Sequence, residues 1–512
     1  MGARASLALA LLLAAAALAV QYQRTALPYV RYDRFDLPAF DPYVYMAMAD
    51  RPQVFTVAPW GYRVLTPVLA RALPLGNVAR GFRVVTVGAL LATAALLWAL
   101  LRRTGASGWA AAVGPALLCL TGPVAEALSL RMLAEPLTLA LETAFLLLLF
   151  AGAGAGPLAL VAVLGALSKE FFLFLLPLVF LVRAPRAGRA AALRLLLLVA
   201  APAVLATLLL RWWWTPHLAV PAPALPLALA RFFGSWREWA PATLLGGLGV
   251  LAVAGAFRAA ARPLRAPAAW LAAATLLPPF VNPVAFFPQD VPRLLIYVLP
   301  LAVPLALLAV EGVLRKGEAL PAPPEWRTSR RLDVACAAAA LLVALSPLLL
   351  DRYRRADLRG PRDGPLVVAT TRETWRTAVR LERGQAVAFT PESHHFTWGV
   401  SDPGELRLMR WFLREGWGPL PQYGTGNFVM RDVRATLLLP CLQPRDVDVE
   451  LALSAPVSVS VNGTPVGEAP AGAARLRLPA RLLFRGDNLL ALERPAGSPP
   501  AALTRVAFAP AP

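Results

Sequence analysis

The sequence predicts a polytopic α-helical membrane domain followed by a soluble β-sandwich domain. Hydrophobic residues make up 58% of the chain, and the mean hydropathy is +0.58, values that soluble domains seldom reach. Apolar stretches of about 20 residues, the length needed to cross a bilayer, recur up to residue 351. After that point short β-like segments alternate with Pro, Gly and Asn turns. We therefore expect a membrane domain over residues 1–351 and a soluble domain over residues 352–512.

The length rule predicts about eleven membrane-spanning helices. The first, residues 4–20, is short and rich in alanine, so it also fits a cleaved signal peptide. The stretch 157–183 is too long for one span and is interrupted by Ser168, Lys169 and Glu170, so we expect two helices that meet at this polar point. The remaining predicted spans are residues 82–101, 108–127, 132–152, 192–212, 242–258, 266–285, 292–312 and 332–350.

The distribution of arginine predicts the orientation of these helices. The formal net charge is +20, and the arginines gather in the short loops 102–107, 183–194, 258–265 and 313–331. Short basic loops are typical of the cytoplasmic side of a membrane protein, and these four fall on one side when 157–183 counts as two helices. We therefore expect a cytoplasmic N-terminus, an external first loop over residues 22–80 and an external C-terminal domain. No basic stripe is interleaved with stacking aromatic residues, so nucleic-acid binding is not expected.

The C-terminal residues 366–510 predict a β-sandwich, because short strands follow one another at regular spacing. Asn462-Gly463 lies between two β-like runs, which is a strong signal for a type I′ hairpin turn. The same asparagine begins an Asn-Gly-Thr glycosylation motif, but the hairpin turn is our preferred interpretation. The chain has three cysteines and no Cys/His cluster at ligand spacing, so no structural metal is predicted and a divalent-cation requirement stays open.

The first loop carries carboxylates that are candidates for catalysis. Asp33, Asp36 and Asp41 precede a short apolar stretch, MAMA, which predicts a helix lying on the bilayer surface. Asp41 would lie at or near the N-cap of that helix. A carboxylate held beside an apolar surface is well placed to take a proton from an acceptor at the membrane edge. The alternative is that these residues serve only the solubility of the loop.

Several cationic residues near apolar segments are candidates for binding a phosphate. Arg63 has a planar fork that fits phosphate oxygens, or it extends only to the membrane interface. Lys169 is one of two lysines in a chain that otherwise uses arginine. Ionisable groups at membrane depth usually mark a pathway or a site, so we expect Lys169 and Glu170 to be functional. The alternative is a Lys–Glu pair that only stabilises the helix break.

A second polar group lies at the predicted outer mouth of the span at 292–312. Asp290 and Arg293 flank Pro292, and Tyr297 follows one helical turn later. These residues would bind a phosphate or sugar hydroxyls, or would anchor the helix at the interface. Arg131 and Glu135 flank an outer loop, and we interpret them as a plain ion pair.

Four motifs together resemble bacterial members of the GT-C superfamily of integral-membrane glycosyltransferases. The motifs are FDPYVYMAMA, YRVLTPVLA, LSKEFFLFLLP and DVPRLLIYVLP, and the resemblance, which covers roughly residues 1–350, is to the protein mannosyltransferase-like and aminoarabinose transferase-like groups. It implies a location in the bacterial inner membrane, a polyprenyl-phosphate-sugar donor and inversion at the anomeric carbon. The implied catalytic carboxylate is Asp41, with Asp36 as second choice. Arg63, Lys169 and Arg293 would hold the lipid phosphate.

The acceptor and the role of the C-terminal domain stay open. The first loop has no Asp-Glu pair, which the protein mannosyltransferases carry, and this departure argues against a protein acceptor. The acceptor stays open among a carbohydrate, a lipid and a protein. The segment EGWGPLPQYGTGNFVMRDVRATLLLP resembles galactose-binding-like β-sandwich modules. Two other functions are considered: a transporter or flippase of lipid-linked sugars, and a non-catalytic protein of envelope glycan assembly. A transporter is expected to have broken helices at matching positions in two halves, and the sequence shows one such break, at Lys169.

Overall fold

The computed structural model divides the chain into two compact units, one made mainly of residues before 352 and one made mainly of residues after 351. Asp33, Asp36, Asp41, Asp290 and Arg131 lie outside the described residues. The structure describes residues 2–24, 45, 48–49, 57–58, 60–73, 78–130, 132–213, 218–219, 245–258, 261–276, 291–314, 329–349, 377–378, 380–389, 416–417, 428–484 and 486–511.

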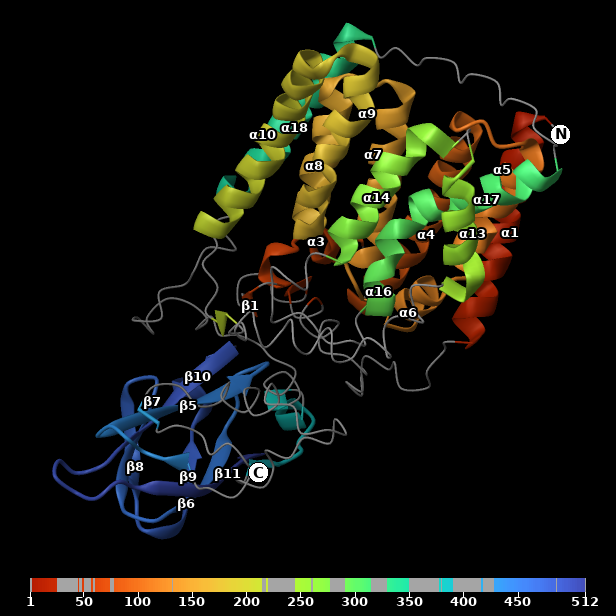
Figure 1. The fold of residues 1–512 in the computed structure, drawn as a ribbon. Helices are drawn as coiled ribbons and strands as arrows, with labels where there is room; N and C mark the ends of the chain where they lie inside the picture. The colour runs from red at the N-terminus through yellow and green to blue at the C-terminus, as the bar shows by residue number, and fades with distance from the viewer. Residues whose placement is uncertain are drawn as a thin grey trace. The chain divides into compact units, whose positions relative to one another are not determined.

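The first unit is a bundle of helices (Figure 1). Short 3-10 segments (η) interrupt or extend several of them. The two-residue strands β1 and β2, which pair with each other, belong to neither unit as a whole. The elements are α1 (Ala3–Arg24), β1 (Val57–Ala58), η1 (Trp60–Tyr62), α3 (Leu65–Ala72), α4 (Val78–Arg103), α5 (Gly108–Cys119), α6 (Gly122–Leu130), α7 (Glu135–Ala151), α8 (Ala155–Ser168), η2 (Glu170–Leu175), α9 (Pro177–Ala187), α10 (Arg189–Trp213), β2 (Leu218–Ala219), η3 (Leu245–Gly247), α13 (Leu248–Ala256), α14 (Arg262–Leu276), α16 (Val291–Leu294), η7 (Leu295–Val298), α17 (Leu299–Leu314) and α18 (Arg330–Leu349).

Fewer helices are long enough to cross a membrane than the sequence predicts. Among the described residues, three qualify by length and composition: α1, the 80–103 part of α4, and the 189–212 part of α10. The pair α5 and α6, bent by 55°, makes a fourth if it counts as one span. The described residues thus show fewer clear spans than the eleven predicted, in part because hydropathy does not register breaks. For example, α8 has 14 residues and rises about 21 Å, less than the ~30 Å hydrocarbon core.

Close helix crossings in this unit use glycine. A Cβ added at Gly156 of α8 would lie 1.9 Å from the carbonyl oxygen of Asp333 in α18. A Cβ at Gly255 of α13 would lie 1.8 Å from the carbonyl oxygen of Leu305 in α17. Both distances are impossible, so these helix pairs approach each other only because glycine stands at the crossing point.

The helix break predicted at Lys169 is present. The segment after α8 folds back along it, because a Cβ at Gly165 would lie 2.2 Å from the Phe172 ring of η2. At the far end of the pair, Arg183 Nη2 of α9 donates to the carbonyl oxygen of Ala153, just before α8, at 2.7 Å. The elements α8, η2 and α9 therefore form an antiparallel hairpin whose tip is Lys169.

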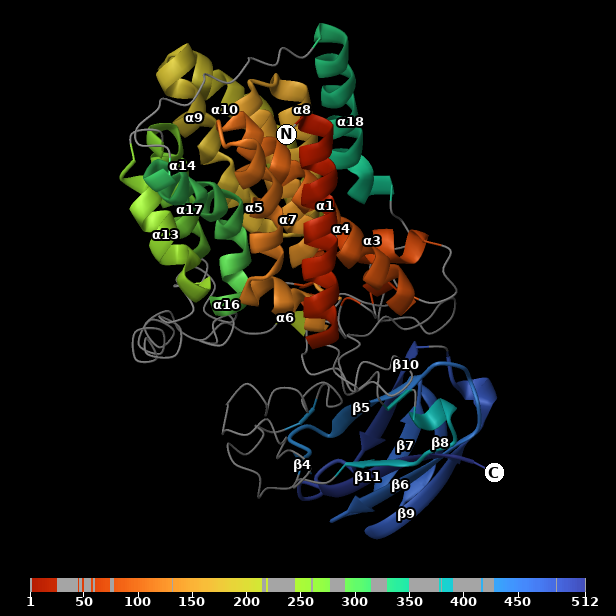
Figure 2. The same ribbon diagram turned by 90° about the vertical axis from the view of Figure 1, so that its right-hand side faces the viewer.

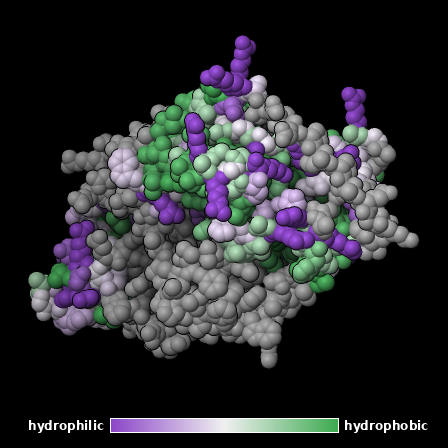
Figure 3. All heavy atoms as spheres, turned by 45° about the horizontal axis from the view of Figure 1, so that its top comes forward, coloured by the Kyte–Doolittle hydropathy of each residue, from purple (hydrophilic) through white to green (hydrophobic). Residues whose placement is uncertain are grey.

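The arginine-rich helix ends gather at one end of the bundle, which we call the arginine end. Arg103 at the end of α4 donates to the carbonyl oxygen of Ala151 at the end of α7 at 3.1 Å. Arg183 lies beside the start of α8, and α18 begins beside Gly154 and Gly156. Ser6 Oγ near the start of α1 donates to the carbonyl oxygen of Gly108, at 2.8 Å, which places the N-terminus of α1 at the start of α5 and therefore next to the end of α4. Figure 3 tilts the upper end of the view in Figure 1 toward the viewer, and hydrophilic side chains project there beside hydrophobic ones.

The second unit contains two antiparallel sheets (Figure 2). One has the order β5-β10-β7-β8, and the other has the order β3-β11-β6-β9, with β4 also paired to β11. Buried residues of both sheets, among them Leu437, Leu490 and Phe508, form one hydrophobic core. The elements are β3 (Val387–Phe389), β4 (Phe428–Val429), β5 (Arg434–Cys441), β6 (Val447–Leu453), β7 (Val457–Val461), β8 (Thr464–Ala469), β9 (Gly472–Leu478), η10 (Ala480–Leu482), β10 (Gly486–Glu493) and β11 (Ala502–Pro510).

The predicted hairpin turn is confirmed. Asn462 and Gly463, between the paired strands β7 and β8, have φ values of +52° and +84°, as a type I′ turn requires. The Asn462 amide nitrogen donates to the carbonyl oxygen of Leu482 and to Asn488 Oδ1, both at 2.8 Å. Asn462 Oδ1 accepts from the backbone N–H of Leu489 at 2.9 Å. The side chain of Asn462 is therefore bonded within the domain on both its amide nitrogen and its amide oxygen.

Candidate functional site

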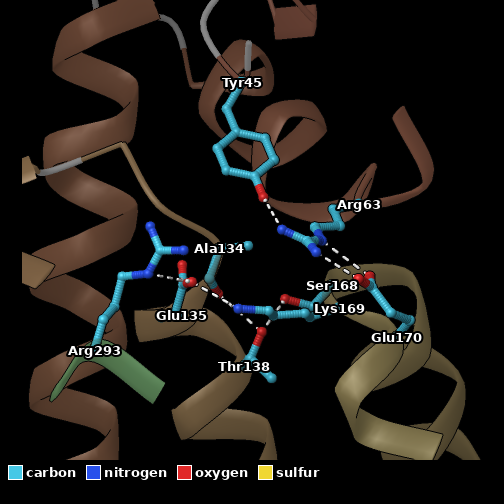
Figure 4. A network of polar contacts seen from close by, with 9 residues as sticks. All are labelled: Tyr45, Arg63, Ala134, Glu135, Thr138, Ser168, Lys169, Glu170 and Arg293. Atoms are coloured by element: carbon cyan, nitrogen blue, oxygen red, sulfur yellow. Dashed lines mark hydrogen bonds and ion pairs between the residues drawn. The ribbon is translucent and has the colours of Figure 1, made fainter. Parts of the chain in front are cut away.

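Predicted site residues from distant parts of the chain meet in the helical unit (Figure 4). Arg63, Lys169, Glu170 and Arg293 lie together with Glu135, and we call these five residues the Lys169 cluster. They come from the segment between η1 and α3, from the hairpin tip after α8, from α16 and from the first turn of α7. This is the end of α7 and α8 opposite to the arginine end.

Glu135 is the anion at the centre of the cluster. Its side chain is 1% exposed, and it stands in the first turn of α7, where the helix dipole favours a negative charge. Lys169 Nζ donates to Glu135 Oε1 at 2.6 Å, and Arg293 Nε lies 3.5 Å from the same oxygen. One carboxylate oxygen is thus shared by two cations from two other elements.

The backbone at the hairpin tip explains how Lys169 reaches Glu135. Lys169 is extended, with φ −161° and ψ 135°, so it ends α8 and its N–H bonds the carbonyl oxygen of Gly165 at 2.8 Å. The hydroxyls of Ser168 and Thr138 lie 2.8 Å apart, and Thr138 also donates to the carbonyl oxygen of Ala134 at 2.9 Å. These bonds fix the tip against the first turn of α7, which places the ammonium group beside the carboxylate.

Arg63 and Glu170 form a second, adjoining ion pair. Arg63 Nε donates to Glu170 Oε2 at 2.9 Å, and Arg63 Nη2 donates to Glu170 Oε1. The third nitrogen, Nη1, donates to the hydroxyl of the buried Tyr45 at 2.8 Å. Two parallel bonds between a guanidinium and a carboxylate give a strong and directional pair.

Tyr297 closes the cluster from η7. Its ring stacks on Phe171 of η2, with centroids 4.2 Å apart and planes 18° apart, so two 3-10 segments touch here. Lys169 Nζ lies 5.3 Å from the Tyr297 ring centroid, a distance at which a cation is attracted to the ring face. The buried hydroxyl of Tyr297 has no hydrogen-bond partner in the described part of the chain.

The cluster contains more positive than negative groups. Three cations face two carboxylates, which leaves a formal charge of +1 in a largely buried place. Cations that gather in a largely buried place are suited to binding an anionic ligand. Within the described ranges, no group of three or more His, Cys, Asp or Glu residues could hold a metal ion.

Sequence reasoning found the cations of this site but missed their shared anion. We expected Glu135 to pair with Arg131, which lies outside the described residues, whereas the structure pairs Glu135 with Lys169 and Arg293. The sequence did contain a signal for Glu135, because it is an acidic residue at the start of an apolar helix. Lys169 was identified on the same ground, that ionisable groups in apolar segments usually mark a site. Asp36, Asp41 and Asp290 belong to parts of the chain that are not described.

Comparison with known proteins found no relative of this chain. No family model, no curated protein and no solved structure matches the chain. The functional argument therefore rests on the Lys169 cluster and on the sequence around it.

Proposed function

We propose that the chain is a membrane glycosyltransferase. It transfers a sugar from a polyprenyl-phosphate donor to an extracytoplasmic acceptor, with inversion, in the bacterial inner membrane. The observation that carries the proposal is the gathering of Arg63, Lys169 and Arg293 in the largely buried Lys169 cluster, at the end of the helical unit opposite to the arginine end. A lipid phosphate carries the negative charge that these cations attract, and its chain partitions into the bilayer.

The proposed reaction is a single displacement. The acceptor hydroxyl oxygen forms a bond to the anomeric carbon of the sugar, and the bond between that carbon and the phosphate oxygen breaks. The bonding electron pair stays on the phosphate, which leaves as polyprenyl phosphate with one additional negative charge. The hydroxyl proton goes to the Asp41 carboxylate, with Asp36 as the second choice, as the resemblance to GT-C enzymes implies. Attack from the face opposite to the phosphate inverts the anomeric carbon.

Lys169 and Arg293 would stabilise the leaving group. Lys169 is buried and Arg293 is partly buried, and both are held by Glu135 before any substrate arrives. Preoriented cations in a site with little water gain strength as negative charge develops on the departing phosphate.

The test is sugar transfer in reconstituted vesicles with a labelled polyprenyl-phosphate sugar. We expect Lys169→Ala to lower transfer by about a hundredfold or more, the usual cost of losing one preorganised electrostatic contact in a transition state. Lys169→Arg should restore only part of the rate, because a planar fork does not replace a compact ammonium group. Lys316→Ala, which changes the only other lysine, is the matched control and should transfer at the wild-type rate. Equal rates for Lys169→Ala and the control would reject the role of the cluster.

Transport of lipid-linked sugars is the second candidate, and one observation favours it. The 3-10 segments η2 and η7 interrupt two helical stretches and touch through Phe171 and Tyr297. Transporters often place their sites at such discontinuous helices. The same vesicles without acceptor separate the two functions: movement of the labelled lipid between leaflets with no transfer when acceptor is added would establish transport.

A further inference from the structure

Arg63 is engaged mainly by protein side chains rather than held ready for a ligand. Three of its N–H groups donate to Glu170 and Tyr45. Arg63 pairs with Glu170, whereas Lys169 and Arg293 share Glu135. The Arg63–Glu170 pair is therefore neutral as a unit.

The geometry of the pair is that of a structural connection. Arg63 is 6% exposed and Tyr45 is fully buried, so the bond between them is shielded from water. Glu170 begins η2 directly after the hairpin tip, and Tyr45 follows Asp41 by four residues in the sequence. The chain Glu170–Arg63–Tyr45 therefore links the helix break at Lys169 to the end of the first-loop sequence that bears the predicted catalytic carboxylates.

We propose that Glu170, Arg63 and Tyr45 are positioning residues: they fix the backbone at Tyr45 to the hairpin tip that bears Lys169, and this link keeps the catalytic site assembled. This role replaces the phosphate contact that the sequence predicts for Arg63. The kinetic consequence rests on the proposed glycosyltransferase function, whereas the structural consequence does not.

The first arm of the test needs no substrate. Tyr45→Phe keeps the buried ring and removes its hydroxyl. Glu170→Gln removes the negative charge of the carboxylate that accepts from Arg63. Loss of a hydrogen bond to a charged group should speed amide hydrogen exchange in the peptide containing residues 45–49 by roughly tenfold or more. Tyr62→Phe is the matched control, because Arg211 lies over the Tyr62 ring, at 5.1 Å, and phenylalanine keeps that ring. Unchanged exchange in both variants would overturn the proposal, whatever the protein catalyses.

The second arm is the kinetics of sugar transfer. We expect Tyr45→Phe and Glu170→Gln each to lower kcat by about tenfold with an unchanged KM for the lipid donor, because the cations are intact. The double variant should be little worse than either single one, since both changes release the same segment. A raised donor KM with an unchanged kcat would instead make Arg63 a phosphate ligand and overturn the positioning role. Faster exchange in a protein that transfers no sugar would retain the structural link and reject the glycosyltransferase.

Discussion

At the scale of single residues, Glu142 is a polar group that the Lys169 cluster does not use. It lies in α7, seven residues after Glu135, and its side chain is fully buried. Neither carboxyl oxygen has a hydrogen-bond partner among the described residues. A buried polar group that is left unpaired costs about 1–3 kcal/mol, so this position carries a stability cost.

Replacing Glu142 should therefore stabilise the protein. We expect Glu142→Leu, which has a similar volume and no polar atoms, to raise the Tm of the detergent-solubilised chain by a few degrees, as a gain of about 1 kcal/mol would. Glu135→Leu is the contrasting control, because it leaves Lys169 and Arg293 without their shared carboxylate and should lower the Tm. A lowered Tm for Glu142→Leu would show that a bound group satisfies this carboxyl.

The predicted catalytic carboxylates are tested at the same scale. General-base catalysis contributes about 10²–10⁴ in rate. We therefore expect Asp41→Asn, which keeps size and capping ability, to reduce sugar transfer by about that factor while the lipid donor still binds. Asp36→Asn should cost much less. A reversed order of the two effects assigns the base to Asp36, and wild-type rates in both variants would reject a carboxylate base in this loop.

At the scale of elements, the success of sequence reasoning depended on whether a signal was local. The β7–β8 turn was predictable because Asn462-Gly463 has the required backbone preference within two residues. The break at Lys169 was predictable because a polar triplet interrupts an apolar run. The partners of Glu135 were not predictable, because Lys169 and Arg293 lie 34 and 158 residues further along the chain and only tertiary packing brings them there.

The β7–β8 hairpin supplies the prediction at this scale. Asn462→Ala removes the three side-chain hydrogen bonds. It also puts alanine at φ +52°, a left-handed backbone conformation that asparagine tolerates better than alanine does. Each unsatisfied buried partner costs about 1–3 kcal/mol, so amide exchange in β7 and β8 of the full chain should become much faster. Asn462→Asp keeps the acceptor for the Leu489 N–H and should have an intermediate effect. Mass spectrometry of the wild-type peptide should find Asn462 without a glycan, and a glycan there would contradict the bonded geometry.

At the scale of the whole helical unit, the two ends of the bundle differ in charge and in chemistry. The arginine end contains Arg103 and Arg183 bonded to helix-terminal carbonyls. The opposite end contains the Lys169 cluster. Helix α7 separates them with 17 residues, a rise of about 26 Å. If the arginine end faces the cytoplasm, as basic loops favour, the Lys169 cluster opens to the outside, where the proposed acceptor is found.

The same geometry predicts where the C-terminal residues emerge. Helix α18 begins at the arginine end, beside Gly154 and Gly156, and its 20 residues rise about 30 Å, so its C-terminal end lies toward the opposite end of the bundle. A cytoplasmic arginine end therefore places the N-terminus of α1 inside and residues 352–512 outside. Alkaline phosphatase fused after residue 360, an enzyme that folds only outside the cytoplasm, should be active, whereas the same fusion in the loop after residue 187 should be inactive. If the second fusion is active and the first is not, the bundle has the opposite orientation and the Lys169 cluster lies on the cytoplasmic side. That result would contradict an extracytoplasmic acceptor in the proposed reaction.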